Sequence, residues 1–277
     1  MTDSIRLGLM PPLTGIVEIY GPEIVRAAQI ACDEINERGG VLGRPLELIV
    51  EDDGSGPTTA VQAAKRLIED HHCVAIIGNL LSNARIAIAT QVAEPKRIPY
   101  LNFAFSEGSI AGRYFFQFAA LPNQQIDTMI PYMAKQFGLK MFFAGTSFEW
   151  PRGSIDSGKR ALLSLGGEVV GEEYVASHDA IEIDRLLRQL ERSGADVFVP
   201  FFAADDLIPL LTRFTEMGLK KRMVAVLGRF DEMIASQLPP QVRDGFYASN
   251  TYFMSLDTVE NKNYLLRLSR RPDIEGV

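Results

Sequence analysis

Apolar and polar residues follow two distinct spacings along the chain. Short apolar runs such as Leu46 to Val50 are typical of buried strands. Other stretches repeat apolar residues every three or four positions, as on one face of a helix. The predicted strands cover residues 5–10, 46–50, 74–77, 99–101, 115–118, 141–144, 169–174, 197–201, 224–227 and 246–248. The predicted helices cover residues 22–38, 58–68, 82–93, 123–137, 151–165, 181–193, 205–217, a short stretch from 231, and 259–270.

The order of these elements predicts an α/β fold. Strands separated by helices form βαβ units, in which the strands pair in parallel and the helices flank the sheet. The alternation restarts near Leu121-Pro122-Asn123, so the sequence predicts two α/β lobes in tandem. In open parallel sheets, ligands bind beyond the carboxyl ends of the strands. The loops that follow the strands are therefore the places to search for function.

Composition narrows the class of protein. The 277 residues are 47% hydrophobic and 23% charged, as in ordinary globular chains. A net charge of −7 gives no general attraction for nucleic acid or anionic lipid. No apolar run approaches the roughly 20 residues that span a bilayer, so no membrane insertion is predicted. The chain shows no secretory signal, which predicts a cytoplasmic protein, or a periplasmic one from which an export signal has been removed.

Signals of enzyme chemistry are scarce, and we predict no catalytic residue, metal or cofactor. The two cysteines, Cys32 and Cys73, have no metal-ligand spacing, and no nucleophile or zinc motif is present. The alternative is a nucleotide-dependent enzyme, because residues 153–159 match the phosphate-loop pattern G-x-x-x-x-G-K. However, Arg160 follows where magnesium binding needs Ser or Thr, and the stretch has the spacing of a helix already begun.

The predicted strand-end loops carry hydroxyls, aromatic rings and an amide. The residues that carry these groups are Tyr20, Ser82, Asn83, Ser106 and Trp150. Ser82 stands at a predicted helix start, where its side chain either contacts a ligand oxygen or caps the helix. Trp150, the only tryptophan, either covers a ligand or packs in a core.

At these loops the chain resembles the type I periplasmic binding proteins of the leucine/isoleucine/valine and amide/urea branch. The matching stretches are GLMPPLTG at 8–15, Tyr20-Gly21, ACDEINERGGVLGRP at 31–45, Glu51-Asp52-Asp53, IIG at 76–78 and IPY at 98–100. The run I-N-x-x-G-G-x-x-G is the most specific of them. The resemblance extends to about Tyr252 and implies two lobes with a hinge between them, which close on a small solute.

The resemblance also implies which residues contact that solute. In the first lobe the implied contacts are Tyr20, Leu81, Ser82, Ala104, Phe105 and Ser106. Ser82 matches the residue that holds a carboxylate or amide, and the loop from Ala104 to Ser106 matches one that offers a carbonyl and a hydroxyl. In the second lobe, Trp150 matches the aromatic residue that covers the ligand, and its W-P-R run is most similar to the amide/urea branch. Later contacts fall near Asp205 and Asp231.

One departure from the family pattern bears on the class of ligand. The resemblance implies that amino-acid binders of the family hold the α-ammonium group with an aromatic residue near Ala203 and a glutamate near Phe230. Here the nearest acids are Asp205, Asp206 and Asp231, so we do not expect that aromatic–acid pair. Leu80, Phe103 and their neighbours instead indicate an apolar or aromatic ligand with one polar head.

Family members also continue well past the last residue here. We therefore expect a first lobe of residues 1–121 and 251–277, incomplete at its C-terminal end, and a second lobe of residues 122–250.

These observations predict a solute-binding protein rather than an enzyme. Its ligand would be a small molecule with a polar head: a branched-chain or other amino acid, an amide, or an aromatic acid. The predicted role is delivery to an ABC-type transporter, whose permease would be the partner. The alternative is a cytoplasmic or fused ligand-sensing domain, whose partner would be a fused signalling module.

Overall fold

The strands of the described chain pair in parallel and form two separate sheets of five. The structure is a computed structural model that describes residues 4–176 and 179–270, so His178 lies outside the described residues. By their contacts the residues divide into two compact units. The first unit holds residues up to 105, residues 109–119 and those from 254; the second holds residues 106–108 and 120–253. The predicted two-lobed α/β fold with parallel sheets is confirmed.

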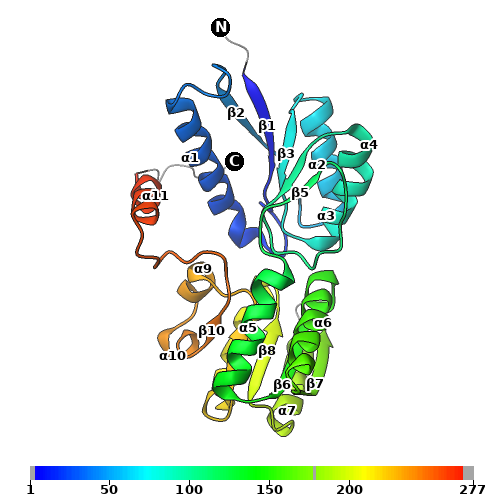
Figure 1. Ribbon diagram of the computed structural model, residues 1–277, viewed down its shortest axis with the longest axis vertical. Coiled ribbons are helices and arrows are strands. Elements are labelled where there is room, and N and C mark those ends of the chain that lie inside the picture. The colour runs from blue at the N-terminus through cyan, green and yellow to red at the C-terminus, as the bar shows by residue number, and fades with distance from the viewer. Residues whose placement is uncertain (1–3, 177–178, 271–277) are drawn as a thin grey trace. The chain divides into compact units, whose positions relative to one another are not determined.

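The sheet of the first unit has the strand order β2-β1-β3-β4-β5. Its strands are β1 (Ile5–Met10), β2 (Leu46–Val50), β3 (Ala75–Gly78), β4 (Tyr100–Asn102) and β5 (Phe115–Gln117). The helices of this unit are α1 (Gly21–Glu37), α2 (Pro57–Glu69), α3 (Ser82–Ile88), α4 (Glu94–Lys96) and α11 (Val259–Ser269). In Figure 1, α1 lies on one side of the sheet and α2, α3 and α4 on the other.

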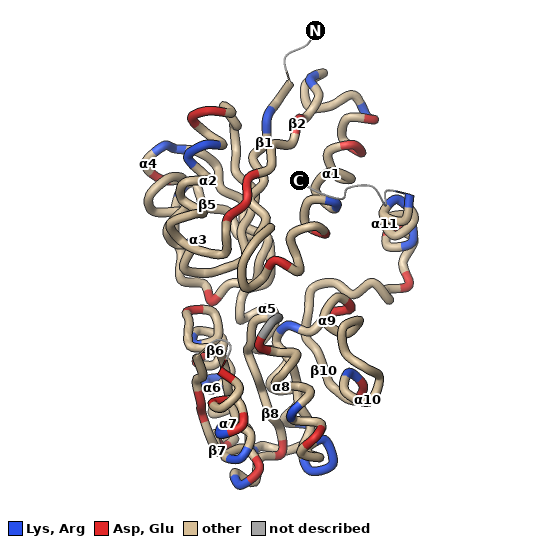
Figure 2. The backbone as a smooth tube through the Cα atoms, turned by 180° about the vertical axis from the view of Figure 1, so that it is seen from behind, with Lys and Arg blue, Asp and Glu red and all other residues tan. Residues whose placement is uncertain are grey.

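The sheet of the second unit has the strand order β10-β9-β8-β6-β7. Its strands are β6 (Lys140–Thr146), β7 (Glu168–Val175), β8 (Val197–Phe201), β9 (Val224–Leu227) and β10 (Tyr247–Ala248). Its helices are α5 (Pro122–Phe137), α6 (Glu149–Ser164), α7 (Ala180–Arg192), α8 (Ala204–Glu216), α9 (Glu232–Ser236) and α10 (Pro240–Arg243). Helices α5 and α6 flank one face of the sheet (Figure 1), and α7 and α8 flank the other (Figure 2).

Local sequence explains where these elements begin and end. All five residues of β8 are buried, as its continuous apolar run predicts for a central parallel strand. Helix α7 begins after Asp179, whose carboxylate accepts hydrogen bonds from the backbone N–H groups of Ile181 and Glu182. Helix α2 begins at Pro57, one residue before the start predicted at residue 58. Proline is well suited to a first helical position, since it lacks the N–H that would need a partner.

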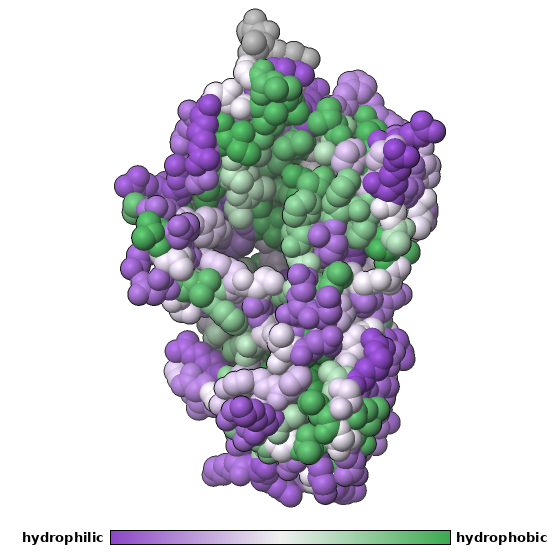
Figure 3. Space-filling view, viewed as in Figure 1, coloured by the Kyte–Doolittle hydropathy of each residue, from purple (hydrophilic) through white to green (hydrophobic). Residues whose placement is uncertain are grey.

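The surface differs between the two units. Acidic and basic residues are interspersed over both units (Figure 2). Apolar residues gather on the visible face of the first unit (Figure 3). In the same unit all residues of β2 are half-buried. Within the described residues, no helix is both long and apolar enough to cross a membrane.

Candidate functional site

Six buried polar residues meet at the carboxyl ends of the strands of the first unit. Each of them is at most 1% exposed, and they are Asp53, Asn79, Ser82, Arg85, Tyr100 and Asn102. Asp53 follows β2 and Asn79 follows β3. Tyr100 and Asn102 are the first and last residues of the short strand β4, and Ser82 and Arg85 lie in the first turn of α3. Because neighbouring parallel strands end at the same edge of the sheet, residues far apart in sequence come together there. We call these six residues the polar cluster.

Arg85 lies at the centre of the polar cluster and is fully buried. Its Nη1 donates to Asn102 Oδ1 (3.0 Å), to the Phe105 carbonyl (3.1 Å) and, at 3.5 Å, to the Ala104 carbonyl. Its Nη2 donates to Ser82 Oγ. Ser82 and Arg85 are three positions apart on α3, so their side chains lie on the same side of the helix. The guanidinium therefore joins the start of α3 to the loop that follows β4.

Asn102 and Tyr100 extend the polar cluster towards β3. The Asn102 amide donates to the carbonyls of Gly78 (2.8 Å) and Asn79 (2.9 Å). The Tyr100 hydroxyl donates to Asn79 Oδ1 at 2.6 Å, and burial raises the pKa of this phenol. The turn after β3 is thus held by side chains from β4, and through Asn102 it is connected to Arg85. Such a network orders the loops in which the predicted contacts lie.

Asp53 is the one carboxyl group of the polar cluster. Its Oδ1 accepts a hydrogen bond from the Ser55 N–H (2.8 Å), and its Oδ2 has no hydrogen-bond partner among the described residues. Burial raises the pKa of Asp53 to about 6; the Ser55 N–H lowers it, the nearby Asp52 carboxylate raises it, and the Asn79 amide lowers it. The structure therefore holds a carboxyl group that titrates well above the usual range of aspartate.

The predicted first-lobe contacts have different surroundings in the structure. Ser82 is not a helix cap: the N-cap of α3 is Leu81, and Ser82 is its first helical residue, bonded to Arg85. The carbonyl of Ala104 accepts from Gln117 Nε2 (2.6 Å) as well as from Arg85. Tyr20 is buried directly before α1 rather than standing at a rim. Thus the structure brings Ser82, Ala104 and Phe105 together around one side chain, that of Arg85.

Ser106 belongs to the second unit, not to the first as the resemblance implies. Its Oγ accepts a hydrogen bond from the Gly108 N–H (3.1 Å), and its own N–H donates to the Ala120 carbonyl (3.4 Å). The first bond closes a short turn over residues 106–108, and the second joins Ser106 to Ala120, which also belongs to the second unit. Its structural role here is to order that turn.

Trp150 lies in the first turn of α6, immediately beyond the carboxyl end of β6. Its ring packs edge-to-face on Phe201, with 5.7 Å between the ring centroids, and it borders the apolar core of the second unit while remaining half-buried. Gly145 permits the close approach of the start of α6 to β6, since a Cβ at that position would lie 2.6 Å from Pro151 Cβ. Trp150 therefore has one side in the core and a part that stays accessible, so both predicted roles are compatible with its position.

The two predicted acidic contacts, Asp231 and Asp205, have different surroundings. Asp231 caps α9, where its Oδ1 accepts from the Ile234 N–H at 3.1 Å. Asp205 lies in the first turn of α8, but its side chain lies outside the described part of the chain. Its neighbour Asp206 is buried and accepts a hydrogen bond from the Thr146 hydroxyl (3.3 Å). Asp231 therefore stabilises the start of α9, and a different acid, Asp206, lies at the strand ends of the second unit.

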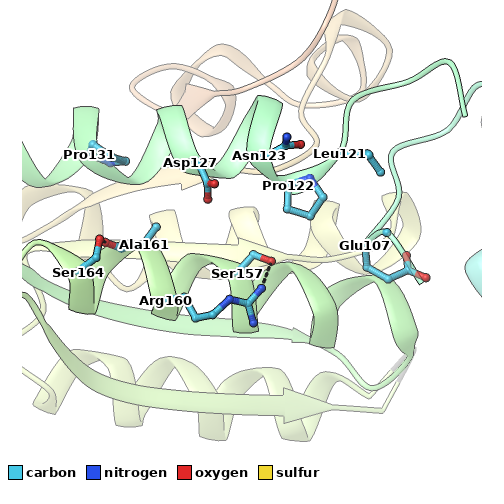
Figure 4. A pocket seen from close by; sticks show the side chains of 11 residues that line it. Glu107, Leu121, Pro122, Asn123, Asp127, Pro131, Ser157, Arg160, Ala161 and Ser164 are labelled. Carbon is cyan, nitrogen blue, oxygen red and sulfur yellow. Dashed lines mark hydrogen bonds between the residues drawn. The ribbon is translucent and has the colours of Figure 1, made fainter. Parts of the chain in front are cut away.

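A cavity of about 660 Å³ opens on the flank of the second unit, between α5 and α6 (Figure 4). Its lining includes Asp127 from α5 and Arg160 from α6, and Arg160 donates to Ser157 Oγ at 2.8 Å. None of the predicted contacts lines it. The cavity lies along the two helices, away from the strand ends, so we place the candidate site at the polar cluster.

The alternative of a phosphate loop is not supported by the structure. Residues 153–159 lie inside α6, which begins at Glu149, so they form no loop that cradles a phosphate. Lys159 is paired with Asp156 (3.0 Å) and Glu172 (2.7 Å).

Among the described residues, no group of His, Cys, Asp or Glu has the arrangement of a metal site. Burial raises the pKa of the Cys73 thiol to about 11, so this thiol is unreactive at neutral pH.

Sequence reasoning missed most of the polar cluster. Asn79 and Asn102 come within two residues after the predicted strands 74–77 and 99–101, and that position was an available signal. The signal for Arg85 was weaker: it lies three positions after Ser82 on the same predicted helix. An arginine in an amphipathic helix usually faces water, so this spacing alone did not indicate a buried guanidinium. Only the packing shows that its guanidinium is buried.

Comparisons with known proteins agree with this architecture. A sequence model of the family described as periplasmic binding protein matches residues 4–274. Leu/Ile/Val-binding protein homolog 7 of Brucella abortus is 25% identical over 241 residues, which are 81% of this chain and 59% of that protein. Leu/Ile/Val-binding protein BraC3 of Rhizobium johnstonii is 38% identical over 91 residues, 33% of this chain and 24% of that protein. The chain thus spans less than two thirds of the length of these relatives.

Two solved structures share the fold at low sequence identity. A solute-binding protein of an ABC transporter from Rhodopseudomonas palustris HaA2, in complex with p-hydroxybenzoic acid, has a TM-score of 0.85 and 18% identity. The alignment covers 97% of this chain and 73% of that one. The branched-chain amino acid transporter substrate-binding protein LivJ from Streptococcus pneumoniae, in complex with isoleucine, has a TM-score of 0.85 and 19% identity, with 98% and 78% covered.

Proposed function

We propose that this chain, which belongs to the periplasmic binding protein family, captures a small solute with a polar head and delivers it to an ABC-type transporter. The observation that carries the proposal is the polar cluster, in which Ser82 stands at the carboxyl end of a parallel sheet and is held by Arg85. Sites of this kind favour ligands that accept hydrogen bonds. The ligands bound by the two solved proteins above, an aromatic acid and an amino acid, indicate the size and chemistry of the solute.

The proposal includes the remaining predicted contacts. Ser82 would donate to the polar head of the solute, and Trp150 would contact its body from the second unit. Because one solute would then be bound by both units, binding would favour the closed arrangement about a hinge. A decrease in the radius of gyration on addition of ligand, measured by small-angle X-ray scattering, would test this step.

A thermal-melt panel tests the proposed function. Amino acids, short amides, urea and aromatic carboxylates are added one at a time, each at up to millimolar concentration. A ligand at a hundred times its dissociation constant adds about 2.7 kcal/mol to the stability of the folded state, which raises the melting temperature by several degrees. A shift by one chemical class supports solute capture. A panel without a shift, repeated after unfolding and refolding to release any bound solute, contradicts it.

Ser82→Ala should weaken the binding of the solute that this panel finds. Removing a hydroxyl that donates to a buried head group costs about 1–3 kcal/mol of binding free energy. Isothermal titration calorimetry measures the loss, and circular dichroism checks that the fold is kept. Ser269→Ala, an exposed serine of the same unit, is the matched control and should leave the affinity unchanged. Equal affinity of Ser82→Ala and the parent would remove Ser82 from the site.

Tryptophan fluorescence should report solute binding through Trp150. This is the only tryptophan in the chain, so its emission needs no assignment. Contact with a solute would replace water next to the half-buried indole, and we expect a shift of its emission to shorter wavelength that saturates with the calorimetric dissociation constant. Emission that stays constant through a titration that saturates by calorimetry would exclude Trp150 as a contact.

A further inference from the structure

We propose that Gln125 is a positioning residue for solute binding, which holds two strand-end loops of the second unit and through them fixes Trp150. The inference rests on the proposed function, in which Trp150 contacts the solute, and adds a residue that sets the affinity without touching that solute. It depends on three features of the second unit: a buried side-chain amide, the two loops that this amide joins, and the packing of one loop against the ring that supports Trp150.

The first feature is the Gln125 amide itself. Gln125 lies in the first turn of α5 and is 6% exposed. Its Nε2 donates to the carbonyls of Gly228 (2.7 Å) and Ser249, which are 103 and 124 positions away along the chain. A side-chain NH2 group has two hydrogens, so both donors of this amide are used within the protein. Because leaving a buried donor or carbonyl without its partner is costly, these two bonds hold the three segments together.

The second feature is the pair of loops that the amide joins. Gly228 directly follows β9 and Ser249 directly follows β10, so both loops lie at the carboxyl edge of the parallel sheet. The loops are also bonded to each other, since Asn250 Nδ2 donates to the Phe230 carbonyl (2.7 Å). Ligands of open parallel sheets bind at this edge. Gln125 therefore fastens both loops to α5 at the edge where the second unit would meet a solute.

The third feature connects the loop after β9 to Trp150. Gly228 lies directly against the ring of Phe201, because a Cβ at position 228 would be 2.3 Å from Phe201 Cε1. The Phe201 side chain is fully buried, and its ring packs edge-to-face on Trp150. Rings in a close-packed core do not shift alone, so a displacement of Gly228 would move Phe201 and with it the support of Trp150. Gln125 acts on the solute through these contacts.

Removal of the amide tests the proposal. Gln125→Leu keeps a side chain of similar size and leaves two carbonyls without their donor. For the solute that the thermal-melt panel finds, we expect the dissociation constant measured by calorimetry to rise about tenfold or more. Gln136→Leu makes the same substitution at an exposed position of α5 and should bind as the parent does. A folded Gln125→Leu protein with the affinity of the parent overturns the proposal.

The pH profile of Gln125→Glu separates hydrogen-bond donation from packing. At pH 8 the carboxylate has no hydrogen to donate and faces two carbonyl oxygens, so binding should be about tenfold or more weaker than in the parent. At pH 5.5 burial and the facing oxygens favour the protonated carboxyl, which can again donate one bond. Most of the loss should be recovered there, relative to the parent at the same pH. A loss that is equal at both pH values, or no loss at pH 8, overturns the proposal, and this comparison decides if Gln125→Leu does not fold.

Trp150 reports its connection to Gln125 even without a ligand, because it is the only tryptophan of the chain. In solute-free Gln125→Leu we expect the time-resolved fluorescence anisotropy to show a larger nanosecond component than in the parent and in Gln136→Leu. A role of Gln125 in stability alone would lower the midpoint of denaturation without this local change. Unchanged anisotropy in the folded variant overturns the connection from Gln125 to Trp150.

The two proposals fail in different ways. If the parent binds a solute and Gln125→Leu matches it in affinity and in anisotropy, the solute-binding function stands and the role of Gln125 is wrong. If no ligand of any class binds to the refolded parent, the proposed function fails together with the role of Gln125 in binding, even where the anisotropy shows that Gln125 holds Trp150.

Discussion

Replacing Asp53 by asparagine should make the protein more stable at neutral pH, by up to about 3 kcal/mol. The Asp53 carboxyl has a pKa of about 6 in the folded chain, against an ordinary value of 3.8. Each pKa unit of difference corresponds to about 1.4 kcal/mol. Since the folded state holds this proton more tightly, stability falls as the pH rises from about 4 to about 6, and above pH 6 the full cost is present. Asparagine keeps an acceptor for the Ser55 N–H and carries no charge.

Urea denaturation of parent and Asp53→Asn at pH 4, 5, 6, 7 and 8 measures this difference. The two proteins should be nearly equal at pH 4 and should diverge as the pH rises, with the variant the more stable. A difference that does not depend on pH would show that Asp53 does not titrate in this range.

The neighbouring Asp52 is a matched control with the opposite sign. Its partial burial raises the pKa of Asp52, but hydrogen bonds from the Thr14 hydroxyl and from the N–H groups of Gly54, Leu13 and Thr14 outweigh this and lower it. An aspartate with a lowered pKa stabilises the folded state above its ordinary value, and that contribution is lost as the pH falls through the lowered one. Asp52→Asn should therefore reduce stability at pH 7, where Asp53→Asn increases it.

The architecture could be predicted from the sequence because spacing is a local property. The apolar run at 197–201 is the buried strand β8, and the helix predicted over 22–38 is α1. Parallel pairing then followed from the alternation of strands and helices. The likeness to binding proteins came from motifs, not from spacing, and the family match confirms it.

The polar cluster could not be predicted in the same way, because it depends on contacts between distant positions. Arg85 meets Asn102 and Phe105, which are 17 and 20 positions away, and no local pattern shows that meeting. For Ser82, the structure excludes the capping role, since the cap position is Leu81, and its contact with a ligand stays a prediction. The sensing role and the cellular location remain predictions from the sequence.

The turn after β3 sets how well the polar cluster is ordered, and Gly78 is the residue that makes this turn possible. Gly78 has a φ of +142°, which residues with a side chain rarely adopt, and a Cβ at this position would lie 2.6 Å from the Met10 carbonyl oxygen of β1. That neighbour is backbone in the adjacent strand of the sheet, so it cannot move aside as a flexible side chain does. The carbonyl of Gly78 also accepts from Asn102, which in turn is bonded to Arg85.

Gly78→Ala should therefore reduce both stability and solute binding. The unfavourable φ costs about 1–3 kcal/mol and the overpacking about as much again, so the free energy of unfolding should fall by about 2–6 kcal/mol. Gly166→Ala is the control: this glycine has a φ of +75° but no atom within 4 Å of its Cβ position, so it should lose only about 1–2 kcal/mol and bind normally. Similar losses in the two variants would mean that backbone conformation alone, and not the contact with Met10, requires glycine at position 78. A Gly78→Ala protein of reduced stability that still binds the solute with full affinity would show that the order of this turn is not transmitted through Asn102 to the site.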